Sequence, residues 1–81
     1  MDEHDILSQI RSLVEREHQL RSQGQDGEIA PDEEQAQLRQ LEESLDQCWD
    51  LLRQRRAKAD AGEDPADADA RPISQVEGYR Q

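Results

Sequence analysis

Aromatic side chains are nearly absent from this sequence of 81 residues, which has no phenylalanine and only Trp49 and Tyr79 as aromatic residues. Apolar residues of all kinds make up 32% of the chain. A chain of this size and composition buries one modest core. We therefore expect a single small module, without a large internal active site, in which a partner covers part of the apolar surface.

Cysteine and long apolar runs are also scarce. Cys48 is the only cysteine, so an internal disulfide is excluded. No apolar run is long enough for a membrane span, and no signal-peptide pattern is present. These absences predict a cytoplasmic protein in a reducing compartment.

Basic residues are outnumbered, with 10 lysines and arginines against 20 acids and a net charge of −10. Sequence-independent nucleic-acid binding requires cations that neutralise phosphates, so this balance argues against direct contact with DNA or RNA. The charge allows a basic protein partner or mimicry of a nucleic acid, although an ordinary solvated surface explains it as well.

Two seams of apolar residues are what the sequence does contain. Their members recur mainly at spacings of three and four, which marks one face of an α-helix, and a loop containing glycine separates them. The pattern predicts an all-α fold, an antiparallel two-helix hairpin resembling a coiled coil, with an extended C-terminal tail. The first seam is Ile6, Ile10, Leu13 and Leu20, and the second is Leu38, Leu41, Leu45, Cys48 and Leu52.

Helix-terminus signals set the expected boundaries. Acids at residues 2–5 suit the positive end of a helix dipole, and Pro31 suits the first position of a helix. We expect a hairpin over residues 1–61, with helices over residues 2–23 and 31–60 joined by a loop over residues 24–30. Residues 62–81 then form an acidic, proline-containing, extended tail.

Heptad assignment makes the pairing of the helices explicit, because antiparallel packing sets each a layer of one helix beside a d layer of the other. The outermost layer pairs an acid with a base, and Glu17 is the one carboxylate among the five inner layers. It either reaches outward to a base such as Arg21, or it sets the register or receives a partner's arginine. The predicted layers are Leu20 with Leu38, Glu17 with Leu41, Leu13 with Leu45, Ile10 with Cys48, Ile6 with Leu52, and Glu3 with Arg55.

One side of the hairpin is apolar beyond its seam, since the e positions hold Leu7, Val14 and Trp49. An isolated pair of helices would leave this apolar side exposed to water, so we expect this side to be a contact surface. A second copy forming a four-helix bundle, a different protein, or the chain's own tail would each cover it.

The tail changes character along its length. An Asp-Ala stretch follows Gly62 and has too little apolar content to fold alone, whereas Ile73, Val76 and Tyr79 are apolar residues at intervals of three. This end of the tail either docks, on the Trp49 face or on a partner, or is a disordered terminus.

Residues with catalytic or metal-binding chemistry do not form a recognisable site. His4 and His18 lie roughly 21 Å apart along a helix and cannot share a metal ion. Cys48 is expected to be a small core residue. Residues 53–58 concentrate four cations, including Arg53 and Arg56, and these fit the negative end of a helix better than a phosphate site. We expect no enzyme activity and no cofactor.

Several strings of residues resemble a known family. They are Glu17-His18-Gln19-Leu20-Arg21, the run from Leu45-Asp46-Gln47-Cys48-Trp49-Asp50 to Arg56, Gly62-Glu63-Asp64-Pro65, and the ending Val76-Glu77-Gly78-Tyr79. The chain resembles a small actinobacterial family of uncharacterised proteins, classified only as a domain of unknown function. The resemblance implies no activity, cofactor or partner.

The sequence therefore predicts a non-enzymatic helical module that binds a protein partner or associates with itself. The expected contact residues are Leu7, Val14, Glu17, Trp49, Arg53, Arg56, Ile73, Val76 and Tyr79. The alternative is an acidic regulator that engages the transcription or translation machinery, by charge mimicry or through the basic cluster. Raised salt separates the two, because it weakens charge-led binding steeply and leaves apolar binding intact.

Overall fold

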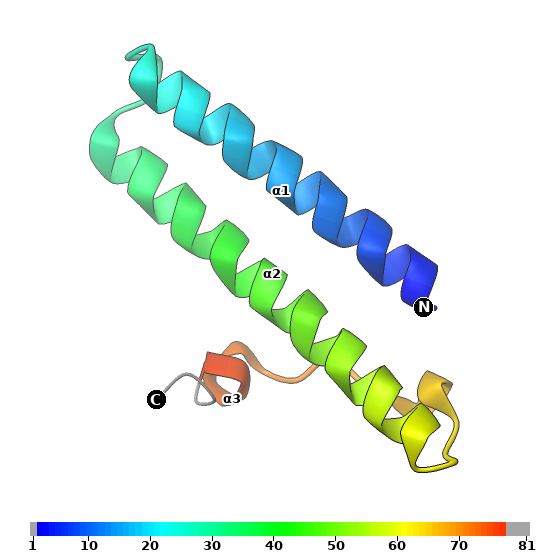
Figure 1. Cartoon of the computed structure of the whole chain (residues 1–81). Coiled ribbons are helices and arrows are strands. Elements are labelled where there is room, and N and C mark those ends of the chain that lie inside the picture. The colour runs from blue at the N-terminus through cyan, green and yellow to red at the C-terminus, as the bar shows by residue number, and fades with distance from the viewer. Residues whose placement is uncertain (1, 78–81) are drawn as a thin grey trace.

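The protein is an antiparallel helical hairpin with a short tail folded back on its second helix, as a computed structural model of the chain describes for residues 2–77 (Figure 1). Helix α1 spans Glu3–Gln25 and helix α2 spans Pro31–Asp60. A 3-10 turn, η1, spans Pro65–Asp67, and a short helix, α3, spans Ile73–Glu77. The predicted all-α hairpin is confirmed.

Local sequence signals account for where the two long helices begin. Asp2 caps α1, because its side chain accepts a hydrogen bond from the Asp5 N–H while the Asp5 side chain accepts one from the Asp2 N–H. This backbone hydrogen bond from Asp5 is the main cause that lowers the pKa of the Asp2 carboxyl. Helix α2 begins at Pro31, which is followed by three acids in its first turn.

Both long helices end in the same way, on a glycine with a positive φ. Gly27 has a φ of 73° and Gly62 a φ of 78°. The N–H groups of Glu28 and Glu63 donate back to the carbonyls of Gln23 and Lys58, at 2.9 Å and 2.7 Å, which completes a Schellman motif at each end. Helix α1 thus extends to Gln25, beyond the predicted end at residue 23.

The core follows the predicted seam between α1 and α2. Ile6, Ile10, Cys48 and Leu52 form one buried cluster. The pairing of Ile6 with Leu52 and of Ile10 with Cys48 agrees with this cluster, and Leu20 is buried nearer the loop. The module measures 51 × 27 × 14 Å, and its shortest dimension barely exceeds the diameter of one helix. No helix of the described residues is long and apolar enough to cross a membrane.

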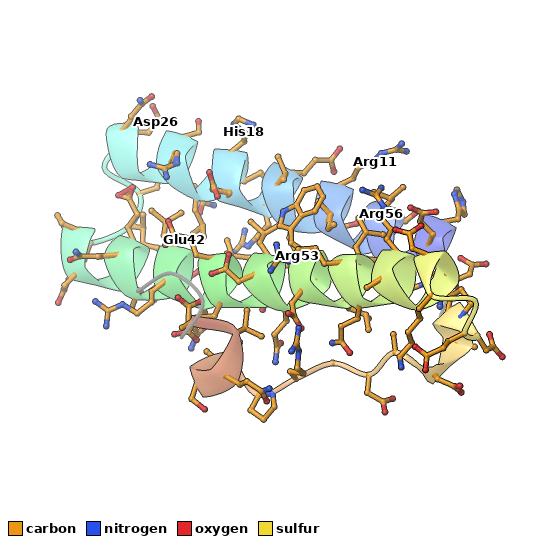
Figure 2. All side chains as sticks on the ribbon, turned by 60° about the horizontal axis from the view of Figure 1, so that its bottom comes forward. Arg11, His18, Asp26, Glu42, Arg53 and Arg56 are labelled. Carbon is orange, nitrogen blue, oxygen red and sulfur yellow. The ribbon has the colours of Figure 1, made fainter. Side chains whose placement is uncertain are left out.

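The tail lies on the opposite side of α2 from α1 (Figures 1 and 2). Both η1 and α3 pack against α2, and within residues 2–77 neither packs against α1. The prediction of an extended tail is wrong in part, because η1 and α3 interrupt the extended backbone. Pro65 begins η1, where the Asp64 side chain accepts a hydrogen bond from the Ala66 N–H.

Candidate functional site

The apolar flank, defined as Leu7, Val14 and Trp49, is only partly covered. Leu7 is half-buried and packs against the core cluster. Val14 and Trp49 remain 39% and 43% exposed, and they are the large apolar side chains that stay exposed within residues 2–77. The flank is therefore open to a partner along the e positions of both helices.

Glu17 lies between the core and the solvent. Its side chain is 27% exposed, and its Oε1 accepts a hydrogen bond from Arg21 Nε at 3.4 Å. The predicted contact with Arg21 is present, and it places a base beside the one carboxylate of the predicted apolar layers.

The basic cluster is divided among several acceptors. Arg56 forms an ion pair with Glu3, with 3.1 Å between Nη2 and Oε1, whereas Arg55 Nη1 donates to the Pro65 carbonyl at 3.3 Å. The predicted layer of Glu3 with Arg55 is thus wrong, because Arg55 turns to the tail and its neighbour reaches Glu3. Arg53 Nη2 lies 3.9 Å from Asp50 Oδ1. The three arginines of residues 53–58 thus lie close to the protein's own acids and carbonyls.

Asp50 is the residue that sequence reasoning missed. Its side chain is fully buried although it stands at an f position, the place on α2 that points away from α1. Arg71, in the tail, donates to both of its carboxylate oxygens, with 2.8 Å between Nε and Oδ2. Gln54 Nε2 donates to Oδ2 at 3.0 Å. A bidentate arginine and an amide together satisfy a carboxylate out of water.

The protonation of Asp50 follows from these contacts. Burial by itself would raise the pKa of the carboxyl, but the hydrogen bonds from Arg71 and Gln54 and the charges of Arg71 and Arg53 outweigh it. The pKa of Asp50 is therefore held below its ordinary value, and the group is an anion at neutral pH. One signal for the pair was available, since Arg71 is the only base between residues 59 and 77.

Two glutamine side chains of α2 hold the backbone of the tail. Gln54 Nε2 donates to the Asp69 carbonyl at 2.7 Å, and Gln47 Nε2 donates to the Arg71 carbonyl at 3.1 Å. Both glutamines stand one heptad apart on α2, on either side of Asp50. The tail is thus bound at its main chain as well as through Arg71.

The apolar residues of the tail differ in how deeply they are buried. Val76 is almost fully buried and Ile73 is half-buried, whereas Tyr79 lies outside the described residues. Val76 lines a groove of about 610 Å³ between the tail and α2, and Trp49 stands at the same groove. We call this the outer groove. Its lining residues are Asp46, Trp49, Asp50, Arg53, Gln54, Ala57, Arg71 and Val76.

Trp49 therefore belongs to both surfaces. The tail docks on the Asp50 face of α2, where Val76 and Trp49 line the same groove, and part of the indole stays exposed.

Cys48 and the acids form no metal site within residues 2–77. Cys48 is a buried free thiol, and burial raises its pKa, which disfavours the nucleophilic thiolate. A second hollow of about 270 Å³ lies beside it, between the two long helices and Ala70.

Known proteins resemble this chain over most of its length. Uncharacterised proteins from two strains of Mycobacterium tuberculosis and from Mycobacterium bovis are each 56% identical to it over 75 residues, which is 93% of this chain and 86% of each relative. No solved structure matches it. The family model described as a protein of unknown function (DUF2630) matches residues 2–81. The chain thus belongs to the DUF2630 family, and the resemblance found in its sequence is confirmed.

Proposed function

We propose that this chain is a helical protein-interaction module that pairs with a second copy of itself through the apolar flank. One observation carries the proposal. Trp49 and Val14 remain 43% and 39% exposed, and their e positions lie on the same side of the hairpin. Burial of an indole stabilises an interface through its large apolar area, and aromatic residues are enriched in such contacts.

The charges around Trp49 favour a second copy over an unrelated partner. Glu42 stands one heptad before Trp49 and Arg56 one heptad after it, about 10 Å away on each side. Figure 2 shows Glu42 and Arg56 toward opposite ends of α2, with Arg53 between them. In a twofold, antiparallel contact of α2 with α2 centred on Trp49, Glu42 of each chain faces Arg56 of the other, whose side chain also pairs with Glu3 of its own chain but is exposed enough to be shared. The surface is thus complementary to itself in charge as well as apolar at its centre.

The experiment is the solution mass of the full chain, measured by light scattering over a concentration series. The wild type should approach twice the mass of one chain as concentration rises. Val14→Glu places a charge in the flank contact and should lower the average mass at high concentration relative to the wild type. Ser12→Glu is the matched control, since it adds the same charge to an exposed position of α1 away from the apolar flank, and it should dimerise like the wild type.

Ionic strength separates this proposal from the acidic-regulator alternative. A contact centred on Trp49 should persist in raised salt, whereas binding led by charge should weaken steeply. A wild-type chain that stays monomeric at every concentration would contradict self-association and leave the apolar flank for another protein.

We propose no chemical reaction and no cofactor for this chain, and we propose that the module acts in the cytoplasm.

A further inference from the structure

We infer that the outer face of α2 is a peptide-binding site, that residues 69–76 occupy it as its ligand, and that the same segment of a second chain occupies it by exchange. We call residues 69–76 the clasp segment. The outer groove shares Trp49 with the apolar flank, but the hydrogen bonds and the ion pair to the clasp segment come from Gln47, Asp50 and Gln54, which lie outside the flank.

The site forms hydrogen bonds with the backbone of its ligand at two points. Gln54 and Gln47 donate their amide hydrogens to the carbonyls of Asp69 and Arg71, at 2.7 Å and 3.1 Å. Hydrogen bonds to main-chain carbonyls do not depend on the ligand's side chains. They therefore hold an extended peptide in a fixed place along α2 whatever its sequence.

Selectivity comes from two side-chain contacts. Asp50, fully buried between the glutamines, receives Arg71 through both carboxylate oxygens. Val76 is buried further along the segment, where it lines the outer groove with Trp49 and Ala57. The ligand class is thus an extended peptide with an arginine and, five residues later, an apolar residue on a helical turn.

The clasp segment is separable from the hairpin. Within residues 2–77, η1 and α3 contact α2 and not α1, and the core cluster lies on the α1 side of α2. Ala70 of the clasp segment borders a hollow that Gln9 and Leu13 of α1 also line, and this hollow opens when the segment leaves. When the segment leaves, Asp50 becomes a solvated carboxylate on an outer helix face and loses its requirement for a partner. Helix α3, with 5 residues, is too short to persist without the groove. Its departure therefore does not require the hairpin to unfold.

A second copy is the partner that the contacts specify. The connection at residues 61–64 is exposed, so it can act as a hinge once the hydrogen bonds of Gly62 and Glu63 to the last turn of α2 open, and η1 then moves with the clasp segment. A clasp segment from another chain would make the same hydrogen bonds and the same ion pair as the chain's own. The free-energy cost of exchanging an identical element is then limited to the conformational change at the hinge and the entropy of association.

Charge reversal across the ion pair tests the exchange with full-length chains. Both variants carry Val14→Glu, which removes the flank contact. In an Asp50→Arg chain two guanidinium groups face each other, and in an Arg71→Asp chain two carboxylates do, so each alone should be a monomer. Mixed in equal amounts, they restore both attractive pairs only between chains. We expect native mass spectrometry to show a heterodimer.

The same-chain double variant Asp50→Arg/Arg71→Asp is the control, and it should regain slow amide hydrogen exchange in residues 73–76. A mixture that stays monomeric while this control recovers would overturn the exchange, because the pair would then form only within a chain. Failure of the control to recover would overturn the site itself. Far-UV circular dichroism of each variant should match the wild type, since these substitutions lie outside the core.

A milder variant gives an independent measurement. Arg71→Gln weakens the chain's own clasp segment and leaves Asp50 in place. A fluorescent peptide of residues 66–77 should bind this variant at least about tenfold more tightly than it binds the wild type, whose site is already occupied. The double variant Asp50→Asn/Arg71→Gln should lose that gain. Equal binding to all three proteins would contradict a peptide site.

Discussion

Arg71 holds Asp50 through both oxygens of its carboxylate, although the two residues are 21 positions apart and Asp50 stands on the helix face that a hairpin leaves to solvent. This ion pair, rather than apolar contact alone, ties the tail to α2. Heptad position f is expected to be exposed to solvent, yet the docked tail makes Asp50 the most completely buried polar side chain of the described residues.

Loss of either partner should free the tail without melting the hairpin. We expect Asp50→Ala and Arg71→Ala each to abolish slow amide exchange in residues 73–76, while helix content stays unchanged. A double-mutant cycle on the free energy of unfolding should give a coupling of about 1–1.5 kcal/mol, because undocking of the tail limits the cost of each variant. A coupling near zero would mean that the pair contributes nothing to docking.

Acid should release the tail. The folded pKa of Asp50 is lowered, so its stabilisation is present above the unfolded value of about 4 and is lost as the pH falls through the lower folded value. Trp49 fluorescence should report this release, because the indole lines the outer groove. Asp50→Asn is the control, since it removes the ionisable group, and it should show no such transition.

Truncations in the hairpin core and in the tail should differ in cost. Leu52→Ala and Ile6→Ala leave cavities in the buried seam and should each lower the free energy of unfolding by about 2–5 kcal/mol. Val76→Ala should cost no more than about 1.5 kcal/mol, because the tail can undock while the hairpin persists. Urea unfolding measures all three. A Val76→Ala cost equal to that of Leu52→Ala would show that tail and hairpin unfold as one unit.

Two glycines near the loop should respond in opposite directions. Gly27 has a φ of 73°, so Gly27→Ala should lower the free energy of unfolding by about 1–2 kcal/mol. Gly24 is helical, and a methyl group there meets only the carboxylate end of Glu34, which is flexible. Gly24→Ala should therefore be neutral or stabilising by up to about 1 kcal/mol. Thermal or urea unfolding of the pair checks the contrast.

Cys48 should resist alkylation in the folded protein. Its side chain is 8% exposed, and burial raises the pKa of the thiol, so little thiolate is available at neutral pH. Iodoacetamide should modify it slowly in buffer and rapidly in urea. Rapid modification of the folded chain would mean that the seam opens at Cys48.

The hairpin was predictable because its causes are local or periodic. The seams at Ile6, Ile10 and Leu52 repeat with the helical period, and the acids at residues 2–5 with Pro31 mark helix starts. The exposed flank also followed from this register, since Val14 and Trp49 occupy e positions. The pairing at the open end did not follow, because heptad position cannot tell which of two adjacent arginines reaches Glu3. The structure selects Arg56.

Sequence periodicity and helix-terminus residues were sufficient to determine two antiparallel helices, since each apolar face needs a partner and the short loop brings the other face to it. The place of the tail was decided only in three dimensions. An aspartate at an f position and a lone arginine in an acidic stretch have no periodic relation. Their pairing depends on the chain reversing after Gly62 and running back along α2, so that Arg71 meets Asp50 where Gln47 and Gln54 hold the backbone.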